Sequence, residues 1–90
     1  MFYVYVLQSE LGRFYIGRTD DLRRRYKEHQ LGKVWTTSRM LPVKLIFYEA
    51  FLSKTDTIRR ERYLKTSKGR SSLKLIIRDS CKITDLPRTM

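Results

Sequence analysis

Five side chains in this 90-residue sequence are of the types needed to hydrolyse a phosphodiester bond. They are two tyrosines, an arginine, the single histidine and a glutamate: Tyr5, Tyr15, Arg25, His29 and Glu61. A carboxylate can hold a Mg²⁺ ion that keeps most of its waters and acts as a Lewis acid on the leaving oxygen. A guanidinium can bind the scissile phosphate through two hydrogen bonds and offset charge in the transition state. A tyrosine near cations can take a proton from the attacking water, because cations favour its phenolate.

Each of these residues also has a purely structural explanation. A lone histidine is usually structural, and the two tyrosines could be core residues whose hydroxyls bond a neighbour. Arg25 could pair with a carboxylate, and Glu61 with a nearby Arg or Lys. The sequence has no P-loop, no GxSxG, no HExxH and no Cys/His metal spacing, so these five residues are the ones left to consider.

Two helical patterns must position three of these side chains. In the segment after Asp20 and Asp21, Arg25 and His29 are four residues apart and lie together on the flank of an apolar stripe. In the later helix, Glu61 falls between Ile58 and Leu64 on the apolar side. A carboxylate on an apolar face is costly unless it is paired, protonated or bound to a cation, and this makes Glu61 a candidate metal ligand.

The net charge predicts a polyanionic partner. Lys and Arg total 20 against 9 Asp and Glu, which gives +11, and the cations cluster at 23–27, 59–62 and 65–74. We expect DNA as the partner, with RNA not excluded. The candidate contacts to phosphate are the backbone at Gly17 and the side chains of Arg18, Lys33 and Lys65.

The cellular compartment is inferred from features that the sequence lacks. The single Cys81 allows no internal disulfide and suits a reducing environment. The apolar start, MFYVYVLQ, has no basic lead-in and no small-residue cleavage site. No apolar run approaches the roughly 18 residues that a membrane span needs. We therefore expect a cytoplasmic protein with no membrane partner.

The first half of the chain predicts a hairpin, a helix and a loop. Residues 2–8 and 13–17 are rich in aromatic and β-branched residues and are expected to pair antiparallel. This pairing could bring Tyr5 and Tyr15 to one face of the sheet. The helix should begin at Asp20 or Asp21 as N-cap and stop near Gly32. In the following loop, 33–42, we expect Trp35 to pack on the core rather than to wait for a base.

The second half predicts one more strand and two helices. Residues 43–52 are almost continuously apolar, as is typical of a central strand covered on both faces. Residues 53–56 are typical of an N-cap region. Helices are expected over about 54–67 and 71–78, separated by a break at 67–69, with Leu73, Ile76 and Ile77 inward. We expect a loose tail over residues 79–90.

Four segments, taken together, resemble the GIY-YIG nuclease domain, and the closest likeness is to its small stand-alone bacterial subgroup. The segments are YVY at 3–5, FYIG at 14–17, RRRYKEH at 23–29 and RRERYLK at 59–65. The resemblance covers roughly residues 2–77. It implies an α+β fold, a three-stranded antiparallel sheet flanked by helices in the order β-β-α-β-α-α. Tyr3 stands where the first motif has its glycine, and the asparagine that some longer members carry late in the domain has no clear equivalent.

The resemblance also implies roles for particular residues. Tyr5 matches the tyrosine of the first motif, and Tyr15 with Gly17 matches the second. Arg25 matches the helix arginine, Glu61 the metal-binding glutamate, and His29 a histidine found in several members. The implied cofactor is Mg²⁺ or Mn²⁺, and the implied activity is cleavage of DNA by a domain spanning residues 1–78.

Three hypotheses about function stay open on the sequence alone. The first is a metal-dependent DNA endonuclease in which Tyr15 is preferred to Tyr5 as the base, because Gly17 and Arg18 follow Tyr15 directly. The second is a nucleic-acid-binding module without catalysis. The third is a basic subunit that needs a protein partner for activity or specificity. The presence of the tyrosines together with Arg25 and Glu61 favours the first, because a binding module could lose Glu61 without penalty.

Overall fold

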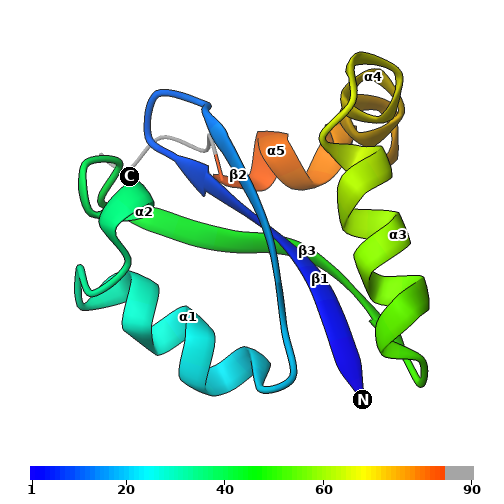
Figure 1. Cartoon of the computed structure of the whole chain (residues 1–90). Helices are drawn as coiled ribbons and strands as arrows, with labels where there is room; N and C mark the ends of the chain where they lie inside the picture. Colours follow the sequence, from blue (N-terminus) through cyan, green and yellow to red (C-terminus); the bar gives the residue numbers. More distant parts are fainter. Residues whose placement is uncertain (85–90) are drawn as a thin grey trace.

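The computed structural model describes residues 1–84, which form a small sheet between two groups of helices (Figure 1). In chain order the elements are β1 (Phe2–Ser9), β2 (Phe14–Thr19), α1 (Leu22–Gln30), α2 (Trp35–Ser38), β3 (Val43–Phe51), α3 (Lys54–Leu64), α4 (Ser67–Ile76) and α5 (Arg78–Thr84). This confirms the predicted α+β fold with a three-stranded antiparallel sheet. The helices α2 and α5 are additions to the predicted order.

Strand β1, not β3, is the centre of the sheet. The strand order is β2-β1-β3, so the prediction that 43–52 forms the central strand is wrong. Residues of β3 do enter the cores on both faces of the sheet, and this is why its sequence is continuously apolar. However, coverage of both faces does not decide which edges of a strand are paired. Only β1 has neighbours on both edges, and its residues from Val4 to Ser9 are all buried.

The two faces of the sheet carry separate cores. On one face, Tyr5 and Leu7 of β1 pack with Leu22 and Tyr26 of α1. On the other face, the second core consists of buried side chains from β1, β2, α3, α4 and the residue between α4 and α5. They are Val4, Val6, Ile16, Leu64, Leu73 and Ile77. Figure 1 shows this arrangement, with α1 on one side of the sheet and α3, α4 and α5 on the other. Strand β2 is the edge that lies between α1 and α3.

The ends of α1 and the start of α3 follow the predicted local signals. The Asp21 side chain accepts a hydrogen bond from the backbone N–H of Arg24, and Ser53 does the same for Asp56. Past the end of α1, Gly32 has φ +74°, a left-handed conformation that costs glycine little. These caps depend on residues within one turn, which is why the sequence alone predicts them.

The boundary between α3 and α4 differs from the prediction. The break falls at Lys65 and Thr66, and Thr66 caps α4, whereas Gly69 lies inside α4. A Cβ at Gly69 would clash with the carbonyl of Tyr63, so this glycine permits the close approach of two helices and does not end one. Because α4 therefore starts earlier, its buried line is Leu73 and Ile77, and Ile76 is 53% exposed rather than inward.

Two further expectations are corrected by short helices. Residues 35–38 form α2, and Trp35 is 71% exposed, so it does not pack on the core. The part of the expected tail over 79–84 belongs to α5, and Cys81 packs against the core on the α3 face. Residues 85–90 of that tail lie outside the described part. Among the helices of residues 1–84, none combines the length and apolar character that would let it span a membrane.

Candidate active site

Three rings from three elements form the buried side of the candidate site. Tyr5 of β1 is directly opposite Gly17 of β2, and Tyr15 is diagonal to Tyr5 on the same face. The ring centroids of Tyr5 and Tyr15 are 6.2 Å apart, and the imidazole of His29 from α1 lies 5.5 Å and 5.0 Å from them. The two tyrosines therefore lie on one face of the sheet, as the hairpin pattern allowed, and His29 joins them from α1.

Gly17 is needed for this ring cluster because there is no space above it. A Cβ at Gly17 would lie 2.6 Å from the Oη atom of Tyr5 and 2.9 Å from a ring carbon of Tyr15. Any side chain here would push the Tyr5 hydroxyl away. The glycine thus fixes where both tyrosines lie. Contact of the Gly17 backbone with nucleic acid stays a prediction.

His29 is held at both of its ring nitrogens. Its Nε2 atom lies 2.7 Å from Oη of Tyr5, and its Nδ1 atom lies 2.6 Å from Oγ1 of Thr37. The side chain has no exposed surface. A phosphate cannot reach it in this conformation, so His29 holds Tyr5 in place rather than contacting substrate directly. The sequence offered no signal for Thr37, because its partner is set by how the loop after α1 folds back.

Burial determines the protonation states of His29 and Tyr5. Desolvation, and to a smaller extent the positive charge of Arg25, lower the pKa of His29 to about 4. Desolvation likewise raises the pKa of Tyr5 to about 12, although the Arg25 guanidinium opposes this. At neutral pH Tyr5 is therefore a neutral phenol, contrary to the expectation that nearby cations would favour its phenolate. Tyr5 is thus rarely ionised at neutral pH, which counts against it as the general base.

Arg25 lies beside the tyrosines at the edge of the site. It is half-buried, and its Nη1 atom lies 3.1 Å from Oε1 of Glu28, so the alternative of pairing with a carboxylate is also realised. Burial alone would lower the pKa of Arg25, but Tyr5, Glu28 and Tyr15 together raise it. Glu28 is itself half-buried. The guanidinium is therefore a fixed, permanent charge at this position.

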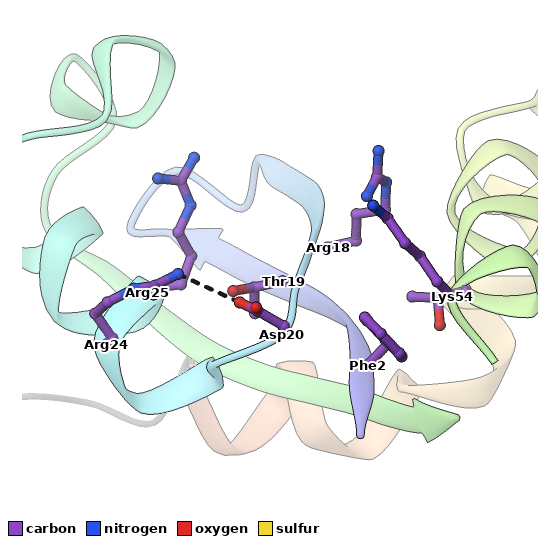
Figure 2. Close-up of a pocket in the computed structure, with 8 residues that line it drawn as sticks. Phe2, Arg18, Thr19, Asp20, Arg24, Arg25 and Lys54 are labelled. Carbon is purple, nitrogen blue, oxygen red and sulfur yellow. Dashed lines mark hydrogen bonds and ion pairs between the residues drawn. The ribbon is translucent and has the colours of Figure 1, made fainter. Parts of the chain in front are cut away.

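A cationic pocket opens next to Arg25. Its lining residues are Phe2, Arg18, Thr19, Asp20, Arg24, Arg25, Lys54 and Thr57. Four of these carry positive charge and one carries negative charge, which suits a phosphate backbone. Figure 2 shows the side chains of Arg18 and Arg25 extending to the same side, from β2 and α1 respectively. The sequence reasoning missed Lys54, whose only local signal is that it follows the N-cap Ser53.

Glu61 lies beyond Arg18, on α3. Its side chain is 16% exposed, with Oε1 at 3.2 Å from Nε of Arg18 and Oε2 at 3.1 Å from Nζ of Lys65. Arg18 and Lys65, both predicted to contact phosphate, are thus paired with Glu61, the predicted metal ligand. Lys33, another predicted phosphate contact, is exposed in the loop after α1. Within the described residues no three His, Cys, Asp or Glu side chains gather as a metal site, so Glu61 would be the main protein ligand for any metal there.

The described residues thus form an α+β domain with a cationic pocket beside two tyrosines, an arginine and a glutamate. Residues 1–74 match the model of the GIY-YIG catalytic domain. The chain therefore belongs to the GIY-YIG family, a family of nucleases.

Several relatives carry the family name UPF0213. One from Streptococcus pneumoniae is 46% identical over 68 residues, covering 73% of this chain and 68% of that protein. Another from Streptococcus agalactiae is 41% identical over 76 residues, covering 82% and 85%. The solution NMR structure of a UPF0213 protein from Bacillus halodurans has a TM-score of 0.54 and 34% identity, and the match covers 84% of this chain and 85% of that one. These matches agree with the predicted small stand-alone subgroup.

Proposed function

We propose that this chain is a metal-dependent endonuclease that hydrolyses phosphodiester bonds in DNA. The observation that carries the proposal is the position of Arg25, a fixed cation beside both tyrosines and on the wall of the cationic pocket. A phosphate seated in that pocket would meet Arg18 and Arg25 from two elements. Membership of a nuclease family supports the same conclusion.

In this proposal each residue has one task. Tyr15, which is half-buried and interacts electrostatically with Arg25, orients the attacking water and takes its proton. Arg25 binds the scissile phosphate and offsets the charge that develops on its oxygens. His29, through its hydrogen bond to Tyr5, holds the ring cluster in a fixed position beside Arg25. Gly17 allows that packing and brings the β2 backbone close to the substrate.

The carboxylate of Glu61 fits a Mg²⁺ or Mn²⁺ ion on two conditions. Mg²⁺ commonly takes one or two carboxylates, several waters and a substrate phosphate, so a single glutamate is sufficient when DNA is present. Arg18 and Lys65 must also give up their bonds to the carboxylate oxygens. A metal held there would act as a Lewis acid on the leaving oxygen. The released Arg18 and Lys65 would then be free to contact phosphates.

The same ion pairs favour a second candidate function. A glutamate already balanced by Arg18 and Lys65 could serve only to tie β2 to α3. The chain would then be a nucleic-acid-binding module that keeps the fold without cleaving.

A cleavage assay separates the two candidates. Supercoiled plasmid, forked DNA and single-stranded DNA would be incubated with the protein in Mg²⁺, in Mn²⁺ and in EDTA. We expect nicked or shortened products with either metal and none in EDTA. A folded protein that binds these DNAs in a gel-shift assay but cuts none of them would support the binding module instead.

A further inference from the structure

Trp35 is an exposed aromatic residue that the proposed active site does not use. Its side chain is 71% exposed at the first position of α2. A tryptophan usually buries most of its large apolar surface, and tryptophan is enriched at interfaces with partners. The question is which kind of partner fits this ring.

The backbone that carries Trp35 is held in place. The Ser38 hydroxyl donates to the Trp35 carbonyl at 2.7 Å, and the Ser38 N–H donates to the Val34 carbonyl at 2.9 Å. Two residues after the tryptophan, Thr37 is buried and bonded to His29. A ring on a fixed turn loses little conformational freedom when it binds a partner. It is also joined, through Thr37 and His29, to the Tyr5 side of the candidate active site.

One cation lies over this ring, and another is close to it in the sequence. The guanidinium carbon of Arg39 lies 4.4 Å from the centroid of the Trp35 ring. Lys33, two residues earlier, is exposed. An aromatic ring with a stacked guanidinium and a nearby lysine combines the two features by which proteins bind single strands: a surface for the flat base and charge for the backbone.

We propose that Trp35 and Arg39 form a stacking site for an unpaired nucleobase. The site gives this chain a preference for nucleic acid with a single-stranded segment beside the candidate active site. This inference rests on the proposed function insofar as both require a nucleic acid ligand. Stacking is tolerant of base identity because every base has a flat face, so the preference concerns strand structure rather than sequence.

The first test uses the fluorescence of Trp35, the single tryptophan in the sequence. The protein would be titrated with oligo(dT), with oligo(U), with a deoxyribose-phosphate oligomer of the same length that lacks bases, and with a blunt duplex. We expect strong quenching by a base-bearing strand and little by the abasic oligomer or the duplex. Comparing oligo(dT) with oligo(U) tells whether the base comes from DNA or RNA. Unchanged fluorescence at saturating concentrations of both would overturn the proposal.

The second test uses variants and binding of labelled strands by anisotropy. Trp35→Ala should weaken binding of oligo(dT) by about fivefold or more and leave duplex binding unchanged, whereas Trp35→Phe should retain most of the affinity. Tyr48→Ala removes an aromatic side chain on β3 that is 55% exposed, and it should not change binding. Equal affinity of wild type and Trp35→Ala for oligo(dT) would also overturn the proposal.

The outcomes distinguish this inference from the proposed function. If duplex DNA is bound and cut but no strand quenches Trp35, the stacking site is wrong and the nuclease stands. If strands quench Trp35 but nothing is cut, the stacking site stands and the nuclease is wrong. If the wild-type protein binds no nucleic acid, both fail. Thermal melts of the Trp35 variants confirm that each sample is folded.

Discussion

The phenol oxygen of Tyr5 lies 2.7 Å from Nε2 of His29, and this contact joins the central strand β1 to helix α1. Because the pKa of His29 is lowered to about 4 by burial and by Arg25, the imidazole is neutral at pH 7. One ring nitrogen then donates a hydrogen bond and the other accepts one. The Thr37 hydroxyl donates to the Val34 carbonyl at 3.5 Å, which favours the arrangement in which His29 donates to Thr37 and accepts from Tyr5.

This histidine should make the protein less stable in mild acid. The folded-state pKa of about 4 is below the ordinary value of 6.5, so the unfolded chain binds more protons between these pH values. Stability from His29 is complete above about pH 6.5 and is lost as the pH falls toward 4, by about 3 kcal/mol in total. Melting curves from pH 7 to 4 for wild type and His29→Gln would check this. Parallel curves for the two proteins would contradict it.

The two tyrosines should respond differently to loss of the hydroxyl. Tyr5→Phe leaves the buried Nε2 of His29 without a partner, which should cost about 1–3 kcal/mol of stability. Tyr15→Phe should cost less but reduce the single-turnover cleavage rate more, because Tyr15 is the proposed base. Denaturant unfolding and single-turnover kinetics on the same samples measure both effects. A larger rate loss in Tyr5→Phe would exchange the two roles.

Arg25→Ala should reduce the cleavage rate by about 10²–10³ and weaken DNA binding only moderately. Stability should change little, because the ion pair with Glu28 joins side chains that are 35% and 34% exposed. Arg23→Ala removes the same charge from an exposed position on α1, and it should cleave like wild type. A folded Arg25→Ala protein with a normal rate would remove Arg25 from the mechanism.

Glu61→Gln tests the metal site. In the alternative in which Glu61 only forms salt bridges, removing its charge would cost about 3–5 kcal/mol if the partner cation were left buried. In the structure the partner cations, Arg18 and Lys65, are 41% and 49% exposed, so water can solvate them. We therefore expect a small change in melting temperature, retained DNA binding and loss of Mg²⁺-dependent cleavage. A Glu61→Gln protein that still cuts with Mg²⁺ would exclude Glu61 as the ligand.

DNA affinity should fall steeply with salt. Each phosphate that a cation neutralises contributes a slope of about −0.9 in log affinity against log salt concentration. Lys33→Ala removes an exposed cation outside the Glu61 ion pairs, so it should reduce the magnitude of that slope by about one phosphate's contribution. Anisotropy titrations of a labelled duplex at several salt concentrations give the slopes. Affinity that hardly changes with salt would argue against binding through phosphates.

Some features of the candidate site can be predicted from the sequence pattern and others cannot. The placement of Arg25 and His29 on the flank of α1, and of Glu61 on a largely covered face of α3, follows from helical spacing. What Glu61 touches does not, because Arg18 is 43 residues away in the sequence. The same holds for Thr37, whose bond to His29 depends on the loop after α1 returning across the end of that helix.

The sequence by itself placed the first cap of α1 at Asp20 or Asp21, and it determined the cap region that starts at Ser53, the turn at Gly32 and the antiparallel hairpin, because each depends on residues within a few positions. It also indicated that β3 would contribute side chains to both cores, since its run of residues is largely apolar. Only the tertiary structure decided that β1 is the central strand and that Trp35 stays exposed. The physical reason is that strand pairing and burial depend on contacts between elements that are far apart in the sequence. The local pattern of residues does not specify those contacts.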